Sequence, residues 1–242
     1  MHFIHGPVEA FPPKGFEDFF GVGPYYRFIK PTGPETGGSD VLDRIRNFPK
    51  GATAEDQMRE LMKDGIGGTV PVPNSDRVDH SGQDAMDYLY GIMEEEGPFD
   101  GIIGYSEGAT VAATIILHEQ RRFETEGRIP TFKCALFFAG WPPMSPDFDV
   151  LVLADQSDLS INIPTCHISK YHHKCLYVDG LSAKHFEVGS LDPYLAGSIA
   201  LFNVCDMDSA HLFDHGKGHT LPRDKHTVKE LGDVIRTMIS NL

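Results

Sequence analysis

The chain has 242 residues and a formal net charge of −14, which is enough length for one folded domain over residues 1–242 without disulfide or metal staples. Its acidic excess is spread along the chain, which argues against a nucleic-acid or anionic-membrane partner because both require a basic surface. The N-terminus lacks the features of a signal peptide, no segment is long enough to span a bilayer, and the four cysteines show no paired spacing. We therefore expect a soluble cytoplasmic protein that associates with neither nucleic acid nor membrane.

The N-terminal part alternates short apolar runs with turn-forming residues. Residues 2–5 are predicted to form a short strand. Residues 11–50 are rich in proline and glycine but also carry many aromatic side chains, so we expect an irregular loop. Such a loop either forms a lid or pocket wall or simply covers the core. A helix follows near residues 54–63.

The remaining two thirds of the chain alternate between helical and strand patterns. Ser81 begins a helix, with a hydroxyl at the cap, apolar residues at helical spacing and Gly97-Pro98 to end it. Strands alternating with helices predict an α/β fold, with a mostly parallel sheet flanked by helices on both faces. The expected elements are strands at 101–104, 132–138, 161–168, 184–188 and 210–213, and helices at 109–117, 193–203 and 228–239.

Residues 104–108 read G-x-S-x-G between a short apolar run and an alanine-rich segment. Strand, sharp turn and helix is the setting of the nucleophile elbow, in which a strained turn lifts a serine hydroxyl above the sheet edge. A chance match in a glycine-rich loop is the alternative, and the flanking segments argue against it. We therefore predict that Ser106 is the nucleophile of a serine hydrolase.

A serine hydroxyl needs a base within hydrogen-bond reach, and the base needs a carboxylate to orient it. In hydrolases with this elbow, the acid and then the histidine follow the serine in the chain. The loop between the last strand and the closing helix holds both His215 and His219, with glycines on either side of Lys217. Loop position favours His219 as the base, with His215 as its competitor.

The acid should end the strand that precedes the histidine loop. Asp192 follows an apolar run and a glycine turn, and Pro193 after it can open a helix. Asp179, Asp206 and Asp208 are weaker because none directly follows a predicted strand. Most aspartates beside turns are caps or solvated, so the residues alone leave the choice of Asp192 open.

A small cluster of cysteine and histidine side chains lies in the second half of the chain. Zinc ligands usually come in pairs at regular spacing, and this cluster has none. We therefore expect no metal and no cofactor. The cluster consists of Cys166, His167, His172, His173 and Cys175.

Six segments together resemble the fungal FSH-type serine hydrolases, small α/β-hydrolases that include esterases and polyketide-releasing thioesterases. The resemblance implies Ser106 as nucleophile, Asp192 as acid and His219 as base, and leaves the Glu107 amide as one oxyanion donor. It implies an ester or acyl thioester substrate, with an acyl carrier protein as a partner in the thioester case. The segments are residues 6–10, 23–28, 104–109, 137–143, 189–193 and 214–223.

The sequence departs from the family pattern twice. Met1 begins at what corresponds to the family's second strand, so we expect the first strand, and the oxyanion donor that follows it, to be missing. Residues 169–187 interrupt the run from strand to predicted acid like an insertion. The missing donor motivates an alternative function, an impaired or inactive pseudohydrolase that binds an acyl ligand. An active hydrolase is our first prediction because the triad residues are present.

Aromatic residues should gather at the carboxyl ends of the strands, where α/β folds bind their ligands. We predict that Tyr25, Tyr26, Tyr105 and Trp141 line an apolar acyl pocket. Its occupant is expected to be the acyl chain of a fatty acid or polyketide in secondary metabolism.

Overall fold

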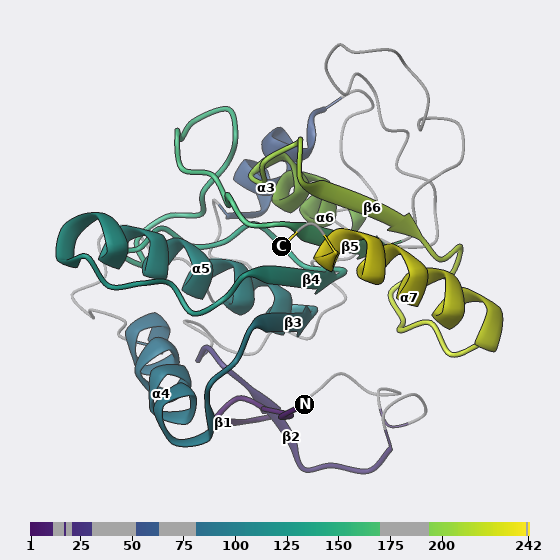
Figure 1. Ribbon diagram of the computed structural model, residues 1–242, viewed down its shortest axis with the longest axis horizontal. Helices are drawn as coiled ribbons and strands as arrows, with labels where there is room; N and C mark the ends of the chain where they lie inside the picture. Colours follow the sequence, from purple (N-terminus) through teal and green to yellow (C-terminus); the bar gives the residue numbers. More distant parts are fainter. Residues whose placement is uncertain (12–16, 18–20, 31–51, 63–80, 170–193, 241) are drawn as a thin grey trace.

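The computed structural model describes residues 1–11, 17, 21–30, 52–62, 81–169, 194–240 and 242. Its centre is a four-stranded sheet in the order β3-β4-β5-β6 (Figure 1). All three pairings are parallel, so the carboxyl ends of the strands share one edge. This confirms the predicted α/β fold with a parallel sheet. The strands are β3 (Gly101–Tyr105), β4 (Cys134–Phe138), β5 (Thr165–Ser169) and β6 (Ala210–Asp214).

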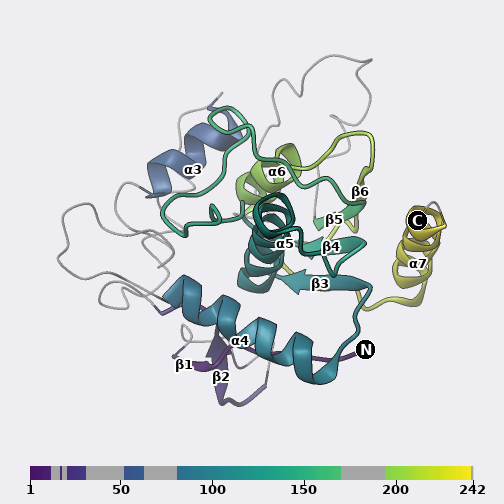
Figure 2. The same cartoon turned by 60° about the vertical axis from the view of Figure 1, so that its left-hand side comes forward.

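Helices cover both faces of this sheet (Figure 2). Helices α5 (Glu107–Glu126) and α6 (Leu195–Asn203) lie on one face, and α7 (Lys225–Ile239) lies on the other. Helix α4 (Ser81–Glu96) packs against α5, and α3 (Ala54–Met62) packs against α6. The predicted helices near 54–63, from Ser81, at 109–117, at 193–203 and at the C-terminus are all present.

The side chains of β4 show why a central strand reads as a continuous apolar run. Cys134 and Leu136 point toward α7 and pack with Cys166, Phe213 and Leu231. Their neighbours Ala135 and Phe137 join the larger cluster formed with α5. Both faces of β4 are covered by helices, which explains why its alternate positions are apolar on both sides.

Local signals set the ends of the long helices. Helix α5 ends at Gly127, whose φ of 70° is the left-handed conformation in which glycine closes a helix. Helix α7 begins after Asp224, whose carboxylate accepts the amide hydrogen of Thr227 at 2.9 Å. The second half of α5 carries several charges, and none of the described helices combines the length and apolar content that a bilayer crossing requires.

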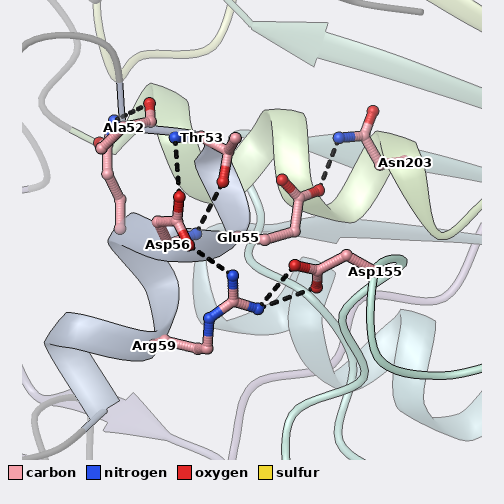
Figure 3. Close-up of polar contacts among 8 residues, drawn as sticks. Ala52, Thr53, Glu55, Asp56, Arg59, Asp155 and Asn203 are labelled. Carbon is pink, nitrogen blue, oxygen red and sulfur yellow. Dashed lines mark hydrogen bonds and ion pairs between the residues drawn. The ribbon is translucent and has the colours of Figure 1, made fainter.

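Polar contacts fasten α3 to its surroundings (Figure 3). Asn203 at the end of α6 donates to Glu55 Oε1 at 2.7 Å. Arg59 donates to Asp155 Oδ1 at 2.9 Å and to Asp56 Oδ1 at 2.6 Å. Helix α3 thereby connects the end of α6 with the loop that contains Asp155. This matters because α6 begins beside the candidate site.

The N-terminal prediction is wrong in its position. Residues 2–5 form no strand; instead β1 (Val8–Ala10) pairs antiparallel with β2 (Tyr25–Arg27). Phe3 and Ile4 are exposed, so these apolar residues have no core to join. The strand Tyr25–Arg27 also corrects the expectation that residues 11–50 are irregular throughout. Most of that predicted loop lies outside the described residues.

Strand β5 begins later than predicted. Pro164 has no amide hydrogen to donate, and the ladder starts at Thr165 rather than at Ile161. Ile161 forms an isolated parallel bridge with Cys205 instead. The predicted strand at 184–188 and the predicted insertion, apart from Ser169, lie outside the described residues. Within the described ranges, no strand pairs with the outer edge of β3, the strand that leads into the elbow.

Candidate active site

Ser106 lies at the turn between β3 and α5. Its backbone has φ 54° and ψ −120°, a combination that residues with side chains rarely adopt and that strongly restrained sites retain. Three backbone hydrogen bonds supply the restraint. The Ser106 amide donates to Phe138 O at 2.8 Å, and the Ser106 carbonyl accepts from Ala109 N at 3.0 Å and Thr110 N at 3.4 Å. The turn is therefore fixed by both the neighbouring strand and the helix.

The first glycine of the motif is required by close packing. A Cβ added at Gly104 would lie 2.4 Å from Ala109 Cα and 2.4 Å from Gly108 O. Both are backbone atoms, so neither can move aside without opening the turn. Gly104 lets α5 start directly against β3, which leaves the Ser106 hydroxyl at the carboxyl end of the sheet.

His219 lies across from this hydroxyl. Its Nε2 is 3.2 Å from Ser106 Oγ, within hydrogen-bonding distance. The imidazole lies between two aromatic rings, with centroid distances of 5.7 Å to Tyr105 and 4.9 Å to Tyr194. The Tyr105 hydroxyl also donates to the His219 carbonyl at 3.3 Å. The residue before the serine thus helps hold the backbone of the histidine loop.

The competing histidine occupies a different place. His215 directly follows β6 and is buried. Its amide donates to Ser169 O at 3.3 Å, which continues the pairing between β5 and β6 by one residue. His215 therefore belongs to the end of the sheet, whereas the part of the loop that holds His219 extends toward the elbow.

Asp192, the predicted acid, lies outside the described residues, as does Asp179. The other two acids considered with them, Asp206 and Asp208, lie at the amino ends of the strands, on the side of the sheet away from Ser106. The Asp206 carboxylate accepts hydrogen bonds from the Ser209 hydroxyl at 2.7 Å and from the Asp208 amide at 3.3 Å. Both aspartates thus belong to the turn that precedes β6, at the amino end of a strand whose carboxyl end leads to His219.

An aromatic row extends from the histidine. The Tyr194 ring, which packs on His219, also lies 6.1 Å from the Trp141 ring. Trp141 is held by two contacts with Thr110, whose Oγ1 accepts from Trp141 N at 3.1 Å and bonds Trp141 O at 3.2 Å. Gly197 on α6 leaves room for the Trp141 ring, because a Cβ at this position would lie 2.1 Å from Trp141 Cδ1. The sequence pattern predicted Trp141 near the site but did not single out Tyr194.

The geometry agrees with a comparison of the sequence with known families. The profile of the family described as Serine hydrolase (FSH1) matches residues 72–231, a span that includes both Ser106 and His219. This chain belongs to the FSH1 serine hydrolase family.

This FSH1 protein is similar to several fungal proteins. It is 30% identical over 163 residues to the esterase FPY3 of Fusarium mangiferae, a match covering 64% of each chain. It is 29% identical over 153 residues to the esterase FUS5 of Gibberella moniliformis, covering 62% of this chain and 52% of the relative. It is 28% identical over 228 residues to the hydrolase phiM of Talaromyces stipitatus, covering 92% and 68%. The chain thus spans between half and two thirds of the first two relatives.

Two of the three tyrosines predicted in the pocket of this FSH1 protein, Tyr25 and Tyr26, make other contacts. The Tyr26 ring stacks on His5 with centroids 4.3 Å apart, and 43% of Tyr26 is exposed. The Tyr25 hydroxyl donates to the Gly21 carbonyl. The next two residues contact the elbow instead: Arg27 and the Phe28 amide both bond the Glu107 carboxylate. No sequence pattern indicated these contacts, because about eighty residues separate the partners.

The Cys/His cluster is divided by the sheet where it is described. Cys166 packs on the α7 side, whereas the His167 ring packs on Phe137 and Phe202 on the other side. Burial raises the pKa of the Cys166 thiol to about 12 and lowers the pKa of His167 to about 3, so both are neutral at physiological pH. Among the described residues, no group of three or more metal-ligating side chains could hold a metal ion. The other three members of the cluster lie outside those residues.

Proposed function

We propose that this protein hydrolyses carboxylic esters or thioesters through an acyl-enzyme formed on Ser106. The observation that carries the proposal is the 3.2 Å separation between His219 Nε2 and Ser106 Oγ, at an elbow that strains the serine backbone. At that distance the imidazole can take the hydroxyl proton as the oxygen attacks the acyl carbon. The same imidazole then returns the proton to the leaving alcohol or thiol, and water releases the acyl group by the reverse sequence.

The negative charge that forms on the carbonyl oxygen requires hydrogen-bond donors. Glu107 opens α5, and amides of a first helical turn have no acceptor within the helix. We propose the Glu107 amide as one oxyanion donor. Asp192 is proposed as the carboxylate that orients His219 and stabilises the imidazolium, in the role that this reaction requires.

The substrate class follows from the surroundings of the pair. Tyr105, Tyr194 and Trp141 give the site an aromatic border, which favours an acyl group with substantial apolar surface. The relatives' names say esterase and hydrolase. We propose a fatty acyl or polyketide chain of secondary metabolism as the acyl part of the substrate, presented in the cytoplasm either as a small-molecule ester or as a thioester on an acyl carrier protein.

The alternative of an inactive, ligand-binding pseudohydrolase has less support. It requires that the site lack a second oxyanion donor, whereas the serine, its strained turn and a histidine at hydrogen-bonding distance are all described. Removing one such donor lowers turnover about 10²–10³-fold in a comparable hydrolase and does not abolish it.

Hydrolysis of p-nitrophenyl esters tests the proposal. The unaltered protein should release p-nitrophenol from acetyl through octanoyl esters, and both Ser106→Ala and His219→Ala should reduce the rate to that of buffer. His226→Ala is the matched control, since His226 is an exposed histidine on α7 and should leave the rate unchanged. Equal rates in the unaltered protein and in both site variants would contradict the proposal.

A further inference from the structure

The Glu107 side chain is held by the segment that follows β2. Glu107 Oε2 accepts the Phe28 amide hydrogen at 2.8 Å, and Glu107 Oε1 lies 3.3 Å from Arg27 Nη2. About a quarter of each side chain is exposed, 24% for Arg27 and 28% for Glu107. A pair this buried is screened less by salt and water than a surface ion pair.

The contact joins two parts of the chain that are distant in sequence. Arg27 lies 80 residues before Glu107, at the end of the small β1-β2 sheet. The Phe28 ring packs beside the elbow as well, with its Cε2 placed 3.8 Å from where a Cβ of Gly108 would be. The segment from Arg27 to Phe28 is therefore fastened to the first turn of α5 through both polar and apolar contacts.

The position of Glu107 creates an electrostatic conflict during the proposed reaction. Its amide is the proposed donor to a developing oxyanion, and its own carboxylate is covalently attached a short distance away. A bare carboxylate there would repel the oxyanion, because a glutamate side chain keeps its carboxylate within the screening length, about 8 Å at physiological salt, of its own amide. The guanidinium of Arg27 offsets this charge, and the Phe28 amide fixes the direction in which the carboxylate points.

We infer that Arg27 is a positioning residue for ester hydrolysis: it neutralises and holds the Glu107 carboxylate, so that the Glu107 amide can stabilise the oxyanion. This inference rests on the function proposed above. It assigns no contact between Arg27 and the substrate. Its effect should appear in the chemical step and therefore in kcat, with little change in KM.

Four variants test the inference through steady-state hydrolysis of p-nitrophenyl butyrate. Arg27→Met is expected to lower kcat about tenfold. Arg27→Lys, which keeps the charge, is expected to cause less than half of that decrease. Adding Glu107→Gln to Arg27→Met should restore most of the lost kcat, because the amide side chain still accepts from Phe28 and carries no charge. Arg121→Met is the matched control, since it breaks the 2.6 Å ion pair with Asp147 at the far end of the same helix and should not change kcat.

Ionic strength separates an electrostatic role from a structural one. The kcat deficit of Arg27→Met should shrink in high salt, because salt screens the repulsion that the variant exposes. A deficit that is independent of salt and unchanged by Glu107→Gln, with a lower thermal midpoint, would overturn the inference while leaving the proposed function intact. An unaltered protein that hydrolyses no ester would overturn the proposed function and this inference together.

Discussion

His219 Nε2 lies 3.2 Å from Ser106 Oγ although the two residues are 113 positions apart. They follow β3 and β6, which are the two edges of the described sheet, so the histidine loop must extend back over the ends of β4 and β5 (Figure 1). The loop is tethered on its way. Lys217 Nζ contacts the Asp224 carboxylate at 3.2 Å, and the Tyr105 hydroxyl bonds the His219 carbonyl. Contacts on both sides of the histidine thus set its distance from the serine.

Replacing Gly104 should disrupt the elbow. Gly104→Ala places a methyl group 2.4 Å from two backbone positions, and we expect a loss of at least about 2 kcal/mol of unfolding free energy together with loss of ester hydrolysis. Gly91→Ala is the matched substitution: Gly91 is an exposed position of α4 with nothing within 4 Å of the added Cβ. It should stabilise the protein by about 0.5–1 kcal/mol. Urea unfolding measures both, and equal effects would contradict the packing argument.

The aromatic row should select the acyl chain. Trp141→Phe and Tyr194→Leu remove contact area beside the site, so kcat/KM for octanoyl esters should fall about tenfold more than for acetyl esters. Phe123→Ala, at an exposed position near the end of α5, is the control and should alter neither. If both site variants lose stability while the ratio of octanoyl to acetyl hydrolysis stays constant, the row supports the fold and not the pocket.

The buried His167 should make the protein sensitive to acid. Burial lowers the pKa of His167 to about 3 in the folded state, whereas its pKa in the unfolded chain is about 6.5. Between these values the unfolded state binds the extra proton, so stability is full above about pH 6.5 and falls as the pH drops. From about pH 7 to about pH 5 the loss from this group is about 2 kcal/mol.

Urea unfolding at the two pH values measures this loss. His167→Asn removes the titrating group, so its stability should fall less between pH 7 and 5 than that of the unaltered protein. His226→Asn, at an exposed histidine, should keep the full dependence on pH. Identical pH dependence in the unaltered protein and His167→Asn would show that His167 is not the group responsible.

Asp192 is predicted to be the triad acid on the sequence alone. Asp192→Asn should lower kcat about 10³–10⁴-fold, because the histidine loses the charge that stabilises its imidazolium form. Asp208→Asn serves as the control, because Asp208 is exposed and lies in the turn before β6, at the amino ends of the strands. A normal kcat for Asp192→Asn would remove that residue from the mechanism and require another acid.

Local pattern and chain order predicted the parts of this protein that they determine. The strand, turn and helix around Ser106 form one continuous segment, and the motif describes its geometry. The histidine loop followed from the chain order of the strands. By contrast, the contacts of Tyr194 with His219 and of Arg27 with Glu107 join distant segments, and no spacing in the sequence indicates them.

The errors at the N-terminus have the same origin. Residues 2–5 are as apolar as Val8–Ala10, but within the part of the chain that the structure describes only the latter pair with a strand, Tyr25–Arg27. Strand pairing decides which apolar run becomes a strand, and pairing is a tertiary property. The late start of β5 was readable in principle, since Pro164 cannot donate to a ladder.

Covalent labelling with a fluorophosphonate probe, followed by mass spectrometry of the peptides, tests the central claim most directly. We expect one stoichiometric adduct on Ser106, with labelling slowed at least about a hundredfold by His219→Ala and unaffected by His226→Ala. An adduct on a different residue, or labelling of Ser106 at the same rate without the His219 imidazole, would contradict it.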